Sequence, residues 1–322
     1  MTFSREVKSE IISTFDESNN ELSILCGALL SAGSLVISNK KMSFTLTSEI
    51  IDFLKAIEKI IKRLTGESEF FITSKKNKYS GNDQFTLAVS PETGEEILSL
   101  CGIIARDEDG HLQINYNGDE HLLAEKDDEI AYLASSFVGG GSISIPDMNE
   151  DGNGRNSGYH MEWTCQTVEQ AERLAEILAS FDILSKKVER NNEQVVYIKE
   201  GDAISDVLKL IKAPKAVLEL ENQRVSRDVR NLANRQANCT VANIEKSVSA
   251  AQKQIDAIMI IDQTIGLKSL PSALKEIATL RLANPDSSLT ELGMILEKTI
   301  SKAAVNQRFK KIIEISKEVG NG

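Results

Sequence analysis

The sequence predicts an α+β fold in which a duplicated αββαββα unit is followed by an all-α domain. A helix-to-strand segment occurs twice with an offset of 108 positions, from Leu22 to Ile130, and the elements after each copy follow in the same order. After Gly266 the pattern changes to short helices with distinct caps. We expect a first repeat at 1–127 that includes an N-terminal helix and the inter-repeat linker, a second repeat at 128–213, a helical arginine-rich connector at 214–266 and an all-α domain at 267–322.

The repeated segment is an apolar helix of small residues that ends at Gly-Ser and passes directly into a β-branched strand. It runs over residues 22–37 and again over residues 130–145. Small residues such as Gly27 and Ser135 would let the two helices approach closely. Two unrelated buried helices with glycine caps are the simpler alternative, but they would not explain the shared order of the elements that follow.

Those elements are expected at matching places in the two halves. In the first half the expected strands lie near 34–38, 42–48, 68–73 and 84–90, with helices at 48–65 and from Pro91. In the second half the expected strands lie near 142–145, 159–166, 183–189 and 194–199, with helices at 168–181 and 202–212. Each half therefore reads αββαββα.

A duplicated αββαββα unit whose first helix ends in glycine resembles the LAGLIDADG homing endonucleases. In that family each signature helix supplies one acidic residue, just before its terminal glycine, to the metal ions that cleave DNA. Here the acid positions hold Ala32 and Gly140. Because Mg²⁺ requires carboxylate oxygens, we expect no nuclease chemistry, no catalytic residue, no metal and no cofactor. An active nuclease that uses acids outside the signature is the enzymatic alternative.

Charge is unevenly distributed along the 322 residues. The net charge is −11, but residues 1–200 carry 19 Lys+Arg against 34 Asp+Glu, and residues 201–322 carry 18 against 14. The C-terminal part is therefore the part suited to a nucleic-acid partner. No long apolar run is present, and we expect a cytoplasmic, nucleoid-associated protein with reduced thiols and no membrane partner. The acidic loop at 147–152 imitates a calcium loop but has Gly158 at position 12, so a polar hairpin loop is expected.

The connector is expected to form a long helix from Lys215 to about Asn238, followed by another from about Val241 to Gln263. The first carries a basic and amide stripe at three- and four-residue steps. Its candidate contact residues are Arg224, Arg227, Asn231 and Arg235. They could face DNA as a secondary contact, or they could join the connector to the acidic N-terminal half, and the sequence favours neither.

The C-terminal residues predict a helix-turn-helix that binds double-stranded DNA. Ser288 to Glu291 form a capping box at the start of a helix that contains Gly293, and Ser301 caps the last helix. Val305 and Phe309 begin the inward stripe of that helix, which continues through Ile312 and Ser316. The opposite face and its flanks supply the expected DNA-binding residues. These are Ser301, Lys302, Ala303, Asn306, Gln307, Arg308, Lys310 and Lys311.

The whole chain resembles the WhiA family of bacterial regulators, which join a degenerate LAGLIDADG domain to a helix-turn-helix. The likeness is carried by residues 215–251, Leu270-Pro271, residues 281–293 and residues 300–308. It departs from the family pattern at Ala303, Ala304 and Gln307.

The resemblance implies a sequence-specific transcriptional regulator that is not an enzyme and is linked to cell division, chromosome segregation or sporulation. The transcription machinery or another regulator would be a further partner. A nucleoid-associated protein that binds DNA without promoter control is the alternative.

Overall fold

The computed structural model describes residues 2–38, 41–66, 69–76, 81–146 and 158–320, which form two compact units, Met1–Arg227 and Asp228–Gly322. The loop predicted at 147–152 lies outside the described residues. Among the helices that are described, none has the length and apolar character that a bilayer-spanning helix requires.

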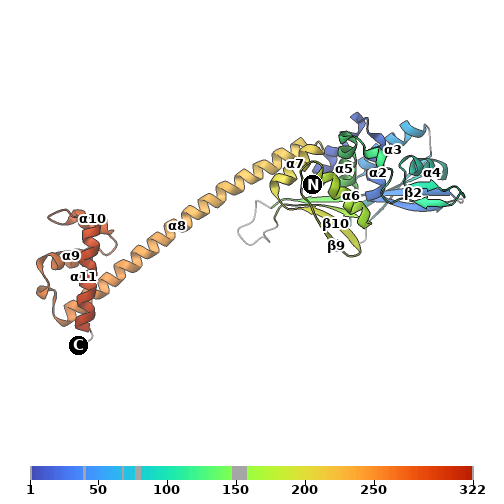
Figure 1. Cartoon of the computed structure of the whole chain (residues 1–322). Helices are drawn as coiled ribbons and strands as arrows, with labels where there is room; N and C mark the ends of the chain where they lie inside the picture. Colours follow the sequence, from blue (N-terminus) through green and yellow to red (C-terminus); the bar gives the residue numbers. More distant parts are fainter. Residues whose placement is uncertain (1, 39–40, 67–68, 77–80, 147–157, 321–322) are drawn as a thin grey trace. The chain divides into compact units, whose positions relative to one another are not determined.

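The first unit contains two copies of one arrangement of helices and strands (Figure 1). The first copy is α2 Glu21–Ala32, β1 Gly33–Ser38, β2 Lys41–Ser48, α3 Ile51–Thr65, β3 Phe70–Lys76, β4 Asp83–Val89 and α4 Pro91–Leu100. The second copy is α5 Lys126–Gly140, β7 Gly141–Ser144, β8 His160–Cys165, α6 Val168–Ala179, β9 Lys186–Arg190, β10 Glu193–Ile198 and α7 Gly201–Leu210. The predicted αββαββα duplication is confirmed.

Further elements precede the first copy and lie between the two. These are α1 Phe3–Ile12, η1 Phe15–Glu17, β5 Ile104–Arg106, β6 Leu112–Ile114 and η2 Glu120–Leu123. The short β5–β6 hairpin was not predicted, because strands of three residues are too short to show a periodic pattern.

The two sheets have equivalent topologies. Their strand orders are β1-β2-β4-β3 and β7-β8-β10-β9, and every neighbouring pair is antiparallel. In each sheet the central strands bury alternate residues, such as Phe44 and Leu46 on β2 and Met161 and Trp163 on β8. This alternation is typical of a sheet with one face against a core.

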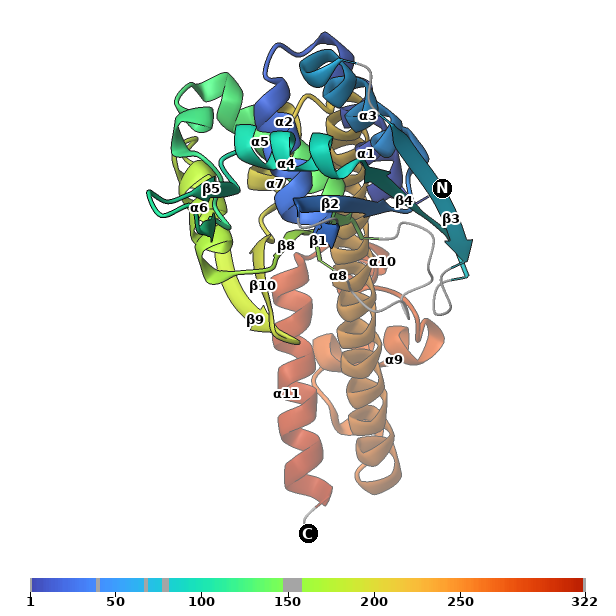
Figure 2. The same cartoon turned by 90° about the vertical axis from the view of Figure 1, so that its right-hand side faces the viewer.

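Helices α2 and α5 lie at the centre of the unit, between the two sheets (Figure 2). A Cβ atom at Gly27 would lie 2.7 Å from the carbonyl oxygen of Tyr132, and Ser135 Oγ donates to the carbonyl oxygen of Ile24 at 2.6 Å. Positions 27 and 135, and positions 24 and 132, are each related by the offset of 108. The same backbone contact is therefore made twice, once in each direction, as a pseudo-two-fold axis requires.

The axis also brings equivalent positions together directly. Asn20 Nδ2 donates to Asp128 Oδ1 at 2.6 Å across this offset of 108 residues. The same carboxylate oxygen accepts from Ser23 Oγ at 3.0 Å. The predicted close approach of the two helices is confirmed, and their N-terminal ends are held by polar contacts that their apolar sequences did not predict.

The first unit also holds the beginning of α8, which extends from Pro214 to Thr264. Glu10 of α1 accepts backbone hydrogen bonds from Lys215 N at 2.8 Å and Ala216 N at 3.1 Å. Amide groups in the first turn of a helix have no partner within the helix, so a carboxylate there acts as a cap and complements the helix dipole. A residue about 205 positions away therefore caps the first turn of α8.

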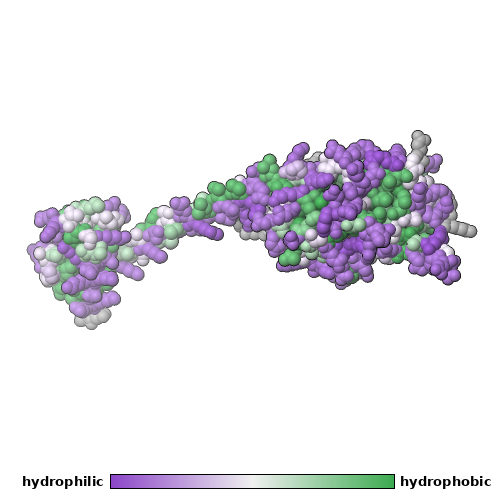
Figure 3. Space-filling view, turned by 45° about the horizontal axis from the view of Figure 1, so that its top comes forward, coloured by the Kyte–Doolittle hydropathy of each residue, from purple (hydrophilic) through white to green (hydrophobic). Residues whose placement is uncertain are grey.

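The prediction of two helices in the connector was wrong, because α8 is one continuous helix. No glycine or proline lies between Pro214 and Gly266, and the residues around Cys239 and Thr240 do not interrupt the backbone hydrogen bonding. Its middle stretch, residues 228–250, is solvent-exposed, and its exposed side chains include the apolar Val229 and Ile244. Hydrophilic and hydrophobic residues both lie along the surface of this helix (Figure 3). The end of α8 beyond this stretch is packed, and Ile258 and Ile261 are fully buried there.

The second unit packs three helices against the end of α8. They are α9 Ser272–Ala283, α10 Leu289–Ile295 and α11 Lys302–Gly320, preceded by the short η3 Leu267–Ser269. The shared core contains Ile258, Ile277, Leu292 and Phe309. The predicted all-α character of the C-terminal part is confirmed.

Candidate nucleic-acid interface

Helices α10 and α11 form a helix-turn-helix whose geometry is set by local sequence. Ser288 Oγ accepts from Glu291 N at 3.2 Å, and Glu291 Oε2 accepts from Ser288 N at 2.7 Å, which completes the predicted capping box at the start of α10. Ser301 Oγ accepts from Ala304 N at 3.3 Å at the start of α11. Both predicted N-terminal caps are confirmed.

Gly293 allows the turn after α10 to fold closely against the helix. Its carbonyl oxygen accepts from Ile300 N at 3.1 Å, and a Cβ at this position would lie 2.5 Å from the carbonyl oxygen of Ile300 and 3.2 Å from Val305 Cγ2. A larger residue would push the start of α11 away from α10.

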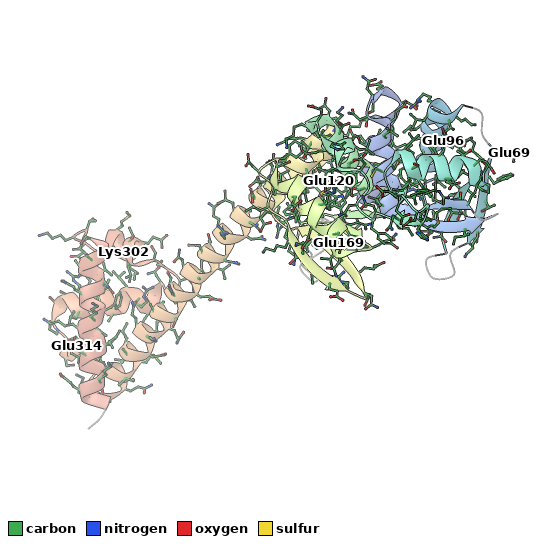
Figure 4. All side chains as sticks on the ribbon, turned by 45° about the vertical axis from the view of Figure 1, so that its right-hand side comes forward. Glu69, Glu96, Glu120, Glu169, Lys302 and Glu314 are labelled. Atoms are coloured by element: carbon green, nitrogen blue, oxygen red, sulfur yellow. The ribbon has the colours of Figure 1, made fainter. Side chains whose placement is uncertain are left out.

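The inner face of α11 anchors the helix. Val305, Phe309, Ile312 and Ser316 are at most 5% exposed, as the three- and four-residue spacing predicted. On the remaining surface, six of the predicted residues are solvent-exposed. They are Lys302, Ala303, Asn306, Gln307, Lys310 and Lys311. Lys302 lies at the beginning of α11, and Glu314 lies about three turns further along (Figure 4).

Arg308 is placed differently from the other predicted residues of α11. Its Nη1 donates to the carbonyl oxygen of Ala273 at 3.3 Å and lies 3.9 Å from Glu276 Oε2. Both partners belong to α9. The guanidinium therefore joins α11 to α9, and it is less available to an external ligand than its exposed neighbours.

Sequence reasoning did not assign a role to Arg281, which is buried behind the helix-turn-helix. Its Nε donates to Gln254 Oε1 at 3.1 Å, and Nη1 donates to the carbonyl oxygen of Ser287 at 2.6 Å. The guanidinium also lies 5.3 Å from the centre of the Phe309 ring, and burial lowers the pKa of Arg281. These contacts fix the loop between α9 and α10. In the sequence, this role was indicated only by the position of an arginine within an otherwise apolar face of α9.

The predicted connector residues divide into two groups. Arg224 Nη2 donates to Asp202 Oδ1 at 2.5 Å, and Arg227 lies over the Tyr159 ring at 5.7 Å. The hydrogen bond to Asp202, opposed by desolvation, raises the pKa of Arg224. These two arginines belong to the first unit and contact other residues of it, while Asn231 and Arg235 of the second unit are solvent-exposed.

The ends of α2 and α5 hold the two positions that correspond to the acid positions of the signature. Ala32 ends α2, and Gly140 ends α5. A Cβ at position 140 would lie 3.1 Å from the carbonyl oxygen of Thr164 and 3.3 Å from that of Ser31. Within the described ranges, no three His, Cys, Asp or Glu residues form a group that could hold a metal ion.

Comparison with known proteins places this architecture in a family. The chain matches the WhiA N-terminal LAGLIDADG-like domain over residues 18–104, the WhiA LAGLIDADG-like domain over residues 129–230 and the WhiA C-terminal HTH domain over residues 233–316. It is 36% identical over 324 residues to the "Probable cell division protein WhiA" of Clostridium perfringens strain SM101, covering 100% of this chain and 99% of that protein. The chain belongs to the WhiA family.

Two further comparisons agree with this assignment. A second WhiA relative, the "Probable cell division protein WhiA" of Thermoanaerobacter sp. strain X514, is 38% identical over 323 residues, covering 99% of this chain and 98% of the relative. The crystal structure of full-length DUF199/WhiA from "Thermatoga maritima" covers 99% of both chains with a TM-score of 0.57 and 23% identity, and it shows the same fold. The predicted WhiA architecture, a LAGLIDADG-like domain with a C-terminal helix-turn-helix, is confirmed.

Proposed function

We propose that the chain is a sequence-specific DNA-binding transcription regulator whose reading element is the first half of α11. The observation that carries the proposal is the exposed polar face of a helix whose opposite side is locked into a core. Asn306 and Gln307 are exposed on this face, and both side chains can bond bidentately to adenine in the major groove. The buried anchors Val305 and Phe309 hold the helix so that this face stays outward.

Positive charge supports the same assignment. Between Lys298 and Lys317 there are six basic residues and one acid, Glu314. Arg308 contacts α9, but Lys302, Lys310 and Lys311 are exposed and would hold phosphates on either side of the groove. Ser301 and the first amide groups of α11 would add a further phosphate contact at the helix N-terminus.

We further propose that the nuclease chemistry of the fold has been lost. Ala32 and Gly140 offer no carboxylate where the homing endonucleases have one, and the backbone around position 140 leaves no room for a longer side chain without movement. Purified protein with Mg²⁺ or Mn²⁺ should leave plasmid DNA uncut. Reproducible metal-dependent nicking that is abolished by replacing acids elsewhere in the chain would contradict this part of the proposal.

The names of the relatives support a proposed biological role, because they are named as probable cell division proteins. We place the chain on the nucleoid, where it would control genes of cell division, chromosome segregation or sporulation together with the transcription machinery or another regulator. DNA immunoprecipitation with sequencing tests this role. Peaks that concentrate at promoters and disappear in the N306A variant are the expected result, whereas broad coverage without promoter enrichment would favour a nucleoid-associated protein without promoter control.

A further inference from the structure

A cleft in the second unit separates α8 from the turn between α9 and α10. It has a volume of about 690 Å³, and all of its lining residues belong to this unit. One wall is formed by residues 240–255 of α8, the other by residues 285–291, and Lys302 at the start of α11 lies at its border. The cleft is therefore continuous with the helix to which we assign base reading.

Much of the cleft carries short polar side chains. Thr240, Asn243 and Ser247 line the α8 wall at three- and four-residue steps, so they share one face of the helix. Ser287 and Thr290 line the opposite wall. Thr240 Oγ1 and Ser247 Oγ each donate to a backbone carbonyl oxygen of α8 at 2.9 Å, so these hydroxyls would have to rotate to donate to a phosphate oxygen. Hydroxyl and amide groups make many of the contacts that proteins form with DNA phosphates and sugars.

The cleft lining carries both cations and acids, and only its two exposed lysines suit a phosphate chain. Lys246 and Lys302 both border it, and among the described residues neither forms an ion pair with a carboxylate. Two acids, Asp286 and Glu291, line the cleft as well. The Glu291 carboxylate is occupied by the capping box, and the hydrogen bond from the Ser288 backbone lowers its pKa.

We infer that this cleft holds the sugar–phosphate backbone of bound DNA, with Lys246 as a phosphate contact outside the helix-turn-helix. The inference rests on the proposed function, because it requires the start of α11 to enter the major groove. In that mode the first helix of a helix-turn-helix crosses the backbone of the duplex. The N-terminal residues of α10 line the cleft, so the strand that passes α10 and Lys302 would lie between the two walls. Ile244 and Val248, also in the α8 wall, would then face deoxyribose carbons.

A matched pair of lysine variants tests the charge in the cleft. Lys246 and Lys253 are exposed on the same side of α8, but only Lys246 lines the cleft. In the full chain, K246A should weaken binding to a specific and a scrambled duplex by the same factor. It should also reduce the slope of log Kd against log salt by about one. K253A should bind both duplexes like the unchanged protein, and equal behaviour of the two variants would overturn the inference.

Crosslinking tests the position of the backbone directly. In a C239S background, which removes the exposed thiol, S247C would carry a photoactivatable aryl azide inside the cleft and K253C would carry it outside. Crosslinks from position 247 alone to the bound duplex are expected. Absence of such crosslinks, or equal yields from both positions, would contradict the assignment.

The N306A variant separates this inference from the proposed function. If N306A loses discrimination between the two duplexes while K246A behaves like K253A, α11 reads bases but the cleft does not hold DNA. If N306A discriminates as well as the unchanged protein, the proposed function itself fails.

Discussion

Gly27 and Gly293 each bring a helix into close contact with a backbone carbonyl, but the two helix contacts have different surroundings. The α2–α5 pair is buried along most of its length, with unbroken buried runs from Ser23 to Leu30 and from Ala131 to Val138. In the α10–α11 contact, α11 is buried on one side only. A helix that is enclosed on all sides can contribute only to stability. A helix that is anchored on one side can present its other side to a ligand. In this chain the first pair is a buried scaffold, and the second leaves one side of α11 exposed.

Among the substitutions that test this comparison, removal of the buried anchor of α11 should have the largest effect on stability. Phe309 is 1% exposed and packs beside Arg281, so Phe309→Ala should destabilise the second unit by about 3–5 kcal/mol. Chemical denaturation of the full chain, followed by circular dichroism, measures the loss. Lys310→Ala on the exposed face is the matched control and should unfold like the unchanged protein. If both variants unfold alike, α11 is not anchored by its apolar face.

Enlarging Gly27 should destabilise the buried pair. A Cβ at this position would lie 2.7 Å from the Tyr132 carbonyl oxygen, so Gly27→Val should cost about 1–3 kcal/mol through overpacking. The same denaturation experiment applies, with Gly158→Ala as control, because a Cβ at Gly158 would meet no atom within 4 Å. Wild-type stability of Gly27→Val would mean that α2 and α5 can separate without loss.

Substitutions on the exposed face of α11 should change binding and leave folding intact. Asn306→Ala should lose about 1–3 kcal/mol at the preferred sequence and little elsewhere, because it removes a base contact. Lys311→Ala should weaken all sequences equally and lower the salt slope by about one, because it removes a phosphate contact. Titration against specific and scrambled duplexes at two salt concentrations separates the two classes. Identical behaviour of the two variants would show that α11 is oriented differently in the complex.

Loss of the cap from α1 should have a smaller effect. Glu10 accepts from both Lys215 N and Ala216 N, so Glu10→Ala should cost about 1 kcal/mol of the stability of the first unit. Glu6→Ala, an exposed acid on the same helix, should change the unfolding midpoint less. Hydrogen exchange of the first amides of α8 should accelerate only in the Glu10 variant. Equal protection of these amides in both variants would show that Glu10 does not cap α8.

The reactivity of the four thiols also reports the difference between buried and exposed regions, with the smallest expected effect. Burial raises the pKa of Cys26 to about 12 and that of Cys165 to about 11, while Cys239 is exposed. The stability that the neutral Cys26 thiol contributes is present below pH 9 and is lost as the pH rises towards 12. Iodoacetamide at pH 8 should modify one thiol in the native chain and four after denaturation. Modification of Cys26 in the native chain would show that the α2–α5 pair opens.

Much of the first unit could be predicted from the sequence, because its signals are local. The Gly-Ser ends of two similar helices and the strands after them define the duplication at an offset of 108. In the second unit, the capping box at Ser288 and the buried stripe of α11 that begins at Val305 likewise depend only on neighbours within a few helical turns. Such patterns act through backbone hydrogen bonding and periodic burial, which a sequence displays directly.

The features that were missed or left open depend on contacts between distant residues. Periodicity could not reveal that Glu10 caps a helix 205 residues away or that Arg308 faces α9 when its neighbours face solvent. It also could not decide between DNA and the acidic N-terminal half for Arg224, which contacts Asp202. A charged side chain has the same local pattern whether it binds a phosphate or a distant carbonyl, so its partner is decided by packing. The sequence by itself thus determined most of the elements and the exposed face of α11, and the tertiary structure decided which of the predicted cations remain exposed to solvent.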